Sequence, residues 1–254
     1  MKFICAIDDK EAGKTAAEIM AEVIVQRSDA LIGLATGSTP INMYSALADM
    51  YKNGEISFKR VKSVNLDEYV GLSSDHRQSY AYFMRENFFK HIDILSENTH
   101  VPSGTADRAS DECERYDRLL DKMGRVDIQL LGIGHNGHIA FNEPSDSFPK
   151  DTTLVRLSDS TVKANSRFFD SEEDVPRQAI SMGIGRILRS RAILLLVTGR
   201  GKADILERAL FGDVTPSVPA SILQFYQGEL TVVGDAGAFA TIKKRHPDVL
   251  IKYC

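Results

Sequence analysis

The chain has 254 residues, of which 43% are apolar and 26% are charged, and its formal net charge is -4. This is the composition of an ordinary globular protein, which can bury a core without a structural disulfide or metal. The negative charge disfavours general attraction to nucleic acid or to an anionic membrane, so small molecules are the favoured partners.

Short apolar runs alternate along the chain with stretches of helical periodicity. Strands are predicted at residues 3–7, 31–35, 61–66, 126–132, 192–198 and 230–233, and helices at 12–26, 41–51, 80–89, 111–123 and 202–210. The alternation predicts an α/β fold with a mostly parallel, Rossmann-like sheet and helices on both faces. Because no flexible linker or repeat interrupts the pattern, we expect residues 1–254 to form a single domain.

The most polar part of the chain lies at residues 145–177, between two predicted strands. A long polar excursion of this kind is a candidate active-site lid, and an ordinary surface insertion is the alternative. The N-terminus has no apolar segment of the length found in signal peptides, and the longest apolar run, Ala192 to Val197, is too short to span a bilayer. A cytoplasmic location is therefore expected.

In open α/β sheets, ligands bind beyond the carboxyl ends of the strands. The first loop at this edge has the sequence ATGSTP, from Ala35 to Pro40, with Thr39 predicted as the helix N-cap and Pro40 as the first helical residue. Glycine, hydroxyls and free N–H groups at a helix start are suited to an anion such as phosphate. A well-capped turn without a ligand is the alternative, because the loop lacks the lysine of a Walker motif.

The second loop follows the strand at 61–66 and contains two acids, Asp67 and Glu68, in the sequence NLDEYVGL. Acids at such a position are commonly turn formers or helix caps. The density of functional groups on the neighbouring loops favours a role in chemistry for these two.

The third loop has the sequence GIGHNGHIAFNEP, from Gly132 to Pro144, and admits three interpretations. GIGHNG matches a dinucleotide-binding fingerprint, but no helical pattern follows it. His135, His138 and Glu143 could form a metal site, although no HExxH motif or cysteine ligand supports this. The third interpretation is acid–base chemistry, in which a carboxylate orients His138 as a proton shuttle.

Cationic side chains occur near the other predicted loops. Arg167 lies in ANSRFFD, and Arg200 and Lys202 lie in GRGKA at a strand-to-helix junction. Cations at such junctions can bind a phosphate, whereas a solvated surface charge is the preferred interpretation for Arg200.

Five motifs, LATGSTP, NLDEYVGL, GIGHNGHIAFNEP, ANSRFFD and GRGKA, together resemble the glucosamine-6-phosphate deaminase (glucosamine-6-phosphate isomerase) family over nearly the whole chain. The resemblance implies conversion of glucosamine 6-phosphate and water into fructose 6-phosphate and ammonia. This is a hydrolase reaction on a C–N bond, and it implies no cofactor and no metal. It belongs to the catabolism of amino sugars such as N-acetylglucosamine.

The resemblance also implies residue roles. Asp67 matches the base that removes the proton from C2, His138 matches the group that opens the sugar ring, and Glu143 matches the carboxylate that orients His138. The expected phosphate and substrate contacts, with Arg167 inside the lid segment, are Thr36, Gly37, Ser38, Thr39, Asp67, Glu68, Gly137, Arg167 and Lys202.

Two positions depart from some members of the family. Asn136 stands where some members have an aspartate in the ring-opening relay, so Glu143 would carry the negative charge alone. Thr153 and Val155 stand where allosterically activated hexameric members have basic residues, which argues against activation by N-acetylglucosamine 6-phosphate.

Other functions of the same scaffold remain as alternatives. They are deamination of galactosamine 6-phosphate, lactone hydrolysis of the 6-phosphogluconolactonase kind, and sugar-phosphate sensing without catalysis. Lactone hydrolysis has no use for a C2 base such as Asp67, and a sensor needs only the phosphate site. The sequence is compatible with a monomer or a homo-oligomer.

Overall fold

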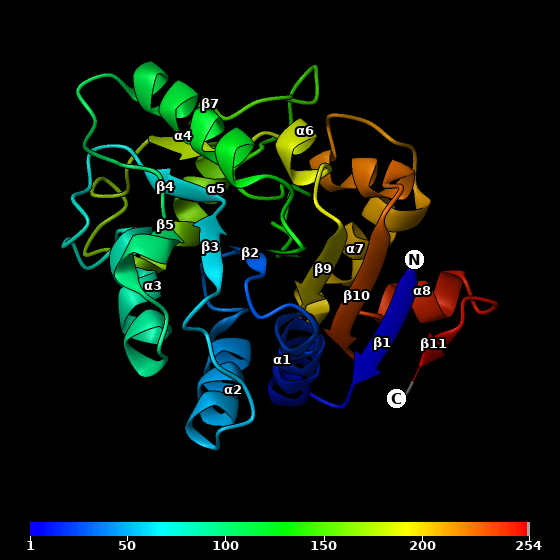
Figure 1. The fold of residues 1–254 in the computed structure, drawn as a ribbon. Coiled ribbons are helices and arrows are strands. Elements are labelled where there is room, and N and C mark those ends of the chain that lie inside the picture. Colours follow the sequence, from blue (N-terminus) through cyan, green and yellow to red (C-terminus); the bar gives the residue numbers. More distant parts are fainter. Residues whose placement is uncertain (253–254) are drawn as a thin grey trace.

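The computed structural model describes residues 1–252, and its centre is an eight-stranded parallel sheet (Figure 1). The strand order is β11-β1-β10-β9-β6-β2-β3-β5. The strands are β1 (Lys2–Ala6), β2 (Leu31–Leu34), β3 (Lys62–Asn65), β5 (Thr99–His100), β6 (Ile128–Leu131), β9 (Ala192–Val197), β10 (Glu229–Asp235) and β11 (Ile251–Lys252). The central strands are buried almost throughout, as continuous apolar runs in parallel sheets predict.

Helices cover both faces of this sheet, which confirms the predicted α/β fold. They are α1 (Asp9–Gln26), α2 (Ile41–Lys52), α3 (Tyr80–Asn87), α4 (Ala109–Met123), α5 (Asp159–Asn165), α6 (Ile184–Ile187), α7 (Ala203–Phe211) and α8 (Ala240–Arg245). Helix α1 packs against α2, and α7 packs against α8. The connections that contain α1 and α2 run along the sheet in one direction, and those that contain α7 and α8 run in the other. Because parallel crossovers are right-handed, the two pairs lie on opposite faces.

The helix boundaries follow from capping. The first predicted helix begins at Asp9, three residues earlier than its apolar periodicity indicates, because the Asp8 side chain accepts a hydrogen bond from the Glu11 backbone N–H at 2.8 Å. The first turn is polar and therefore carries no periodic signal. Helix α2 begins at Ile41 with Pro40 as its N-cap, so the predicted cap at Thr39 is one residue off. Pro40 already has near-helical φ and ψ of -81° and -3°, which shifts the boundary.

A second, smaller sheet was not predicted from the sequence. It is antiparallel, with the order β4-β8-β7, and consists of β4 (Asp67–Tyr69), β8 (Gln178–Ser181) and β7 (Thr153–Arg156). Strands of only three or four residues give almost no periodic pattern. Together with α5, this sheet packs around a cluster of buried side chains, namely Tyr69, Phe141, Leu157, Val162, Val175 and Ala179. The segment at 145–177 thus contains β7, α5 and the 3₁₀ helix η3 (Ser166–Phe168).

The chain reverses its direction across the main sheet between β2 and β6, which are hydrogen-bonded neighbours. The connection after β2 leads to β3 on one side, and the connection after β6 leads to β9 on the other. The loops after β2 and β6 therefore diverge, and this topological switch point is where open α/β sheets leave a ligand crevice.

No helix within residues 1–252 is both long enough and apolar enough to cross a membrane.

Candidate active site

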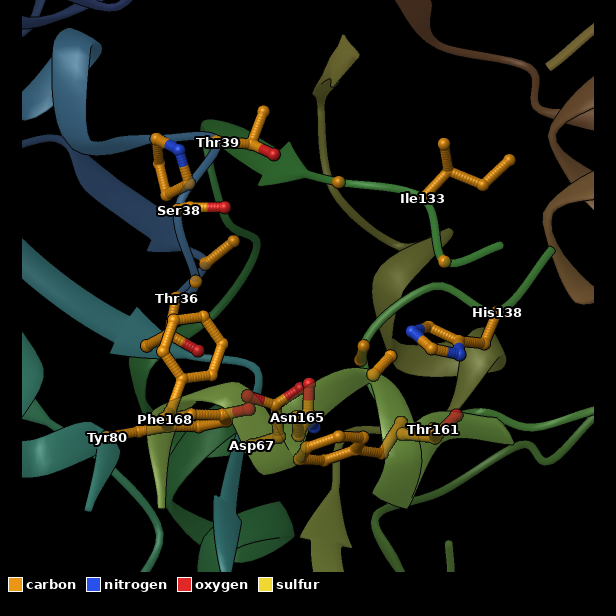
Figure 2. Close-up of a pocket in the computed structure, with 18 of the residues that line it drawn as sticks. Thr36, Ser38, Thr39, Asp67, Tyr80, Ile133, His138, Thr161, Asn165 and Phe168 are labelled. Carbon is orange, nitrogen blue, oxygen red and sulfur yellow. The ribbon is translucent and has the colours of Figure 1, made fainter. Parts of the chain in front are cut away.

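A cleft of about 660 Å³ opens at the switch point. Its walls come from the loops after β2, β3, β6 and β9 and from the segment that contains α5 and η3, so the three loops selected from the sequence meet there. Figure 2 shows Thr36, Ser38 and Asp67 on one wall of the cleft and His138 across from them.

One end of the cleft is formed by the turn after β2. Gly37 has a positive φ of 95°, a conformation that side chains with a Cβ rarely adopt, so glycine is required for this turn. Thr36, Ser38 and Thr39 all line the cleft. The turn therefore offers hydroxyls and backbone groups to a ligand, while Pro40 starts the helix behind it.

Two cations line the cleft, and neither forms an ion pair with an acidic side chain within residues 1–252. Lys202, in the 3₁₀ helix η4 (Arg200–Lys202), donates to the backbone oxygen of Ile133 at 2.7 Å. Arg167, in η3, reaches the Ser38 hydroxyl at 3.5 Å. Burial, followed by the charge of Arg167, lowers the pKa of Lys202 to about 8. An anion bound between the two cations would relieve this repulsion.

Two other candidates, His135 and Arg200, have exposed side chains. His135 is exposed, and burial of part of its ring, with the charge of Lys202, lowers its pKa. Arg200 is also exposed and does not line the cleft, in agreement with its interpretation as a surface charge.

Asp67 is the first residue of β4 and lines the middle of the cleft, with only 6% of its surface exposed. Burial, with a smaller contribution from the neighbouring Glu68 carboxyl, raises the pKa of Asp67 to about 8. No cation or hydrogen-bond donor among residues 1–252 offsets this effect. A carboxyl of this kind is ready to exchange a proton near neutral pH, as a general base requires.

Glu68 does not line the cleft. Its carboxylate accepts hydrogen bonds from the backbone N–H groups of Tyr69, Tyr80 and Ala81, each at 2.9 Å, and so caps the start of α3. Burial raises the pKa of Glu68 to about 7 in spite of these three bonds. Successive residues of a strand point to opposite sides, which explains why Asp67 and Glu68 have different surroundings.

His138 lies on a tight turn in the loop after β6. A Cβ on Gly134 would lie 2.3 Å from the His138 ring, so the turn places the imidazole where only glycine leaves room. Gly137 forms the same turn and does not line the cleft, whereas Ala140, which does, has a positive φ of 52°. An alanine in this conformation is strained, and such strain is concentrated at functional sites.

His138 is paired with Glu143. The Nδ1 atom of His138 lies 3.7 Å from Oε2 of Glu143, within ion-pair range. Asn136 donates to the same oxygen at 2.6 Å, and its own oxygen accepts from the His138 backbone N–H at 3.2 Å. Although burial opposes ionisation, the nearby His138, together with Thr161 and Asn136, lowers the pKa of Glu143 to about 2. Glu143 is therefore a carboxylate that can orient the imidazole.

Aromatic side chains that the sequence reasoning missed cover the Asp67 side of the cleft. Tyr69 and Tyr80 pack with their ring centroids 4.9 Å apart, and Phe168 closes over the same region (Figure 2). The Asn165 side chain donates to the Tyr69 hydroxyl at 2.8 Å and ties α5 to β4. Tyr69, Asn165 and Phe168 lie inside motifs already quoted, NLDEYVGL and ANSRFFD. Only their contacts in the structure show that they cover this side of the cleft.

The two other interpretations of the third loop find no support in the geometry. No helix begins within residues 132–152, so GIGHNG does not open the helix that a dinucleotide-binding fingerprint requires. In the part of the chain that the structure describes, no three histidine, cysteine or acidic side chains gather in a way that could hold a metal ion.

The fold and the cleft together define a class: an α/β protein whose switch-point site joins an anion-binding end to acid–base groups. The comparison with known families makes this more specific. The model of the family described as "Glucosamine-6-phosphate isomerases/6-phosphogluconolactonase" matches residues 9–232. The chain belongs to this family.

Several relatives carry a single activity in their names. A glucosamine-6-phosphate deaminase from Lachnoclostridium phytofermentans is 52% identical over 233 residues, which cover 92% of this chain and 98% of the relative. One from Clostridioides difficile is 48% identical over 238 residues, covering 94% and 96%.

Solved structures agree with this assignment. A monomeric glucosamine-6-phosphate deaminase matches with a TM-score of 0.92 and 43% identity, covering 95% of this chain and 100% of that one. A 6-phosphogluconolactonase from Thermotoga maritima matches with a TM-score of 0.71, 22% identity and coverage of 92% and 99%, which shows a shared fold.

Proposed function

We propose that this protein is an enzyme that converts glucosamine 6-phosphate and water into fructose 6-phosphate and ammonia. One observation carries the proposal: the buried Asp67 carboxyl faces the same cleft as the His138–Glu143 pair, which comes from a different loop. The relatives named above as glucosamine-6-phosphate deaminases support the choice of substrate.

The phosphate is proposed to bind at the end of the cleft where Lys202, Arg167 and the Thr36–Thr39 turn meet. Two cations that have no acidic partner among the described residues, together with the Ser38 hydroxyl, suit a doubly charged anion. This contact is remote from the reacting carbons, so its binding energy can hold C1 and C2 in place between Asp67 and His138.

Ring opening is the proposed task of His138. The imidazole takes a proton from the hydroxyl on C1 and returns one to the ring oxygen, which breaks the C1–O5 bond and forms the open-chain aldehyde. Glu143 is a carboxylate with a pKa of about 2, so it holds His138 in place and stabilises the imidazolium that forms. Asn136 supports Glu143 as a hydrogen-bond donor and adds no charge.

Carbon chemistry is the proposed task of Asp67. The carboxylate removes the proton from C2, the aldehyde oxygen on C1 takes a proton from the substrate's ammonium group, and an enolamine forms between C1 and C2. Protonation at C1 then gives an iminium ion at C2. Water adds to this carbon and ammonia leaves, which yields the ketone of fructose 6-phosphate. The reaction requires no redox step, and atoms and charge balance without a cofactor.

The alternatives differ in what they require of Asp67. Lactone hydrolysis involves no carbon acid and would leave the buried carboxyl without a task, and a sensor would need only the cation end. Galactosamine 6-phosphate differs only at C4 and is the other substrate to test. Thr153 and Val155 on β7 supply no cation, which supports the absence of activation by N-acetylglucosamine 6-phosphate.

Two further properties follow from the proposed reaction. A sugar phosphate is a dianion that does not cross a bilayer unaided, which supports a cytoplasmic location. The similar solved deaminase is described as monomeric, which supports a monomer.

The decisive experiment is an assay of purified protein that measures ammonia and fructose 6-phosphate together. With glucosamine 6-phosphate, we expect the two products in equal amounts, and the assay is repeated with galactosamine 6-phosphate and with 6-phosphogluconolactone. Release of 6-phosphogluconate from the lactone, with no ammonia from either amino sugar, would replace the proposal with the lactonase function.

A further inference from the structure

Ser158 joins the proposed ring-opening pair to the segment that carries Arg167. It lies between β7 and α5, and its hydroxyl oxygen accepts from the Thr161 backbone N–H at 3.3 Å as the N-cap of α5. The same hydroxyl donates to Oε2 of Glu143 at 3.1 Å. One side chain thus contacts both a helix start and the carboxylate that orients His138.

The hydrogen bonds around Ser158 favour Glu143 as the acceptor of its proton. A serine hydroxyl has one proton and two lone pairs. The Thr161 N–H and the Asn136 amide, whose nitrogen lies 3.5 Å away, can only donate to it. Glu143 is an ionised carboxylate and can only accept. Ser158 can donate its proton to Oε2 of Glu143 at 3.1 Å or to the Thr161 hydroxyl at 3.0 Å, and either partner can donate in its 3.0 Å contact with Ser160. Glu143 is the charged acceptor among them and forms the stronger hydrogen bond.

Oε2 of Glu143 receives its two donors from different parts of the chain. Asn136 belongs to the loop after β6, and Ser158 belongs to the start of α5. Helix α5 continues directly into η3, which carries Arg167 to the cation end of the cleft. The position of α5 therefore affects both the phosphate contact and the hydrogen bonding of Glu143.

We infer that Ser158 is a positioning residue for the proposed reaction: its hydroxyl holds Glu143 against His138, and it does so only when α5 is seated. The inference rests on the proposed deaminase function. Binding of the phosphate by Arg167 would then favour the arrangement in which the ring-opening pair is complete. The phosphate, which does not react, would in this way help to assemble the His138–Glu143 pair.

Three substitutions separate this role from simple helix capping. Asparagine, aspartate and serine cap helices equally well, whereas alanine does not. If Ser158 only caps α5, Ser158→Asp retains activity and Ser158→Ala loses it. If Ser158 positions Glu143, Ser158→Asp is the worse variant, because an added carboxylate cannot donate to Glu143 and repels it.

We expect Ser158→Thr to keep kcat within about twofold of wild type, because the hydroxyl donor remains. Ser158→Ala should lower kcat about tenfold, which is the loss expected for a hydrogen bond to a charged group. Ser158→Asp should lower it further. Ser166→Ala is the matched control, because Ser166 lies at the other end of α5 and donates to the backbone oxygen of Lys163. Its kcat should equal that of wild type.

A second measurement does not depend on catalysis. The Glu143 carboxyl can be titrated by ¹³C NMR in each variant, with Glu143→Gln used to assign its signal. His138 is the titratable group that interacts with Glu143, and Asp159 is the nearest acid in the first turn of α5. Loss of the donated hydrogen bond should raise the pKa of Glu143 in Ser158→Ala, and the added charge should raise it more in Ser158→Asp.

The outcomes are distinguishable. A wild-type titration of Glu143 in the Ala and Asp variants, or a Ser158→Asp enzyme as active as wild type, would overturn the inference and leave the deaminase function intact. Shifted titrations in a protein that releases no ammonia would instead support the contact between Ser158 and Glu143 and reject the proposed reaction.

Discussion

At the residue scale, neighbouring side chains of the same type have different surroundings, which suit them to different proposed roles. Asp67 and Glu68 are adjacent acids, yet Glu68 binds three backbone N–H groups at the start of α3, while Asp67 faces the cleft and has no hydrogen-bond donor in the part of the chain that the structure describes. Glu143, the third acid, receives donors from Asn136 and Ser158 and stays ionised. The proposed base and the proposed orienting carboxylate are thus distinguished by burial and hydrogen bonding.

The role of Asp67 predicts the kinetics of Asp67→Asn. The amide cannot accept the C2 proton, so kcat should fall by about a hundredfold to ten-thousandfold, the range for loss of a general base. KM should change little, because the phosphate contacts are remote from this side chain. Steady-state ammonia release and exchange of deuterium from C2 would measure this loss. Asp213→Asn, at an exposed site, is the control, and ammonia release from Asp67→Asn at the wild-type rate would exclude the enolisation role.

At the element scale, the turn after β6 supplies the histidine, and its backbone geometry requires glycine. Gly134 accepts from the Gly137 N–H, donates to the His138 carbonyl and lies directly beneath the imidazole. The turn therefore leaves room for the imidazole only because residue 134 has no side chain.

Gly134→Ala should therefore displace the His138 ring, because the added Cβ would lie 2.3 Å from it. We expect kcat to fall at least about tenfold with KM nearly unchanged. Gly132→Ala is the matched variant, since a Cβ there meets nothing within 4 Å, and its loss should be clearly smaller. Equal effects of the two substitutions on kcat would show that the position of the ring does not depend on Gly134.

At the scale of the whole molecule, the Asp67 carboxyl should make stability depend on pH. Its pKa is about 8 in the folded protein and 3.8 in a model peptide, so the folded state binds the extra proton between these values. Stability should therefore fall as pH rises from about 4 to about 8, by at most about 1.4 kcal/mol per pH unit from this group. Function is then maintained at some expense of stability, as is common for active sites.

Asp67→Asn removes this dependence. Its Tm should exceed that of wild type by a margin that widens between pH 4 and pH 8 and then levels off. Thermal unfolding of both proteins across this range, with Asp213→Asn as the control, would measure the margin. A constant difference in Tm at every pH would mean that Asp67 has an ordinary pKa in the folded protein.

The sequence by itself determined the α/β fold, six of the eight strands of the main sheet, five helices and the loops that hold the site. Periodicity reports burial on one or both faces, and the order of strands and helices limits the topology, so these features need no contacts. The resemblance to known motifs added Asp67, His138 and Glu143 as candidates for chemistry.

Only the tertiary structure decided what surrounds these residues. The separation of Asp67 from Glu68, the aromatic cover from Tyr80 and Phe168, the small antiparallel sheet and the hydrogen bond from Ser158 to Glu143 all depend on segments far apart in the chain. Their elements are too short to leave a periodic pattern. Burial and hydrogen bonding, which set the pKa of a carboxyl, arise from neighbours in space that no local sequence pattern records.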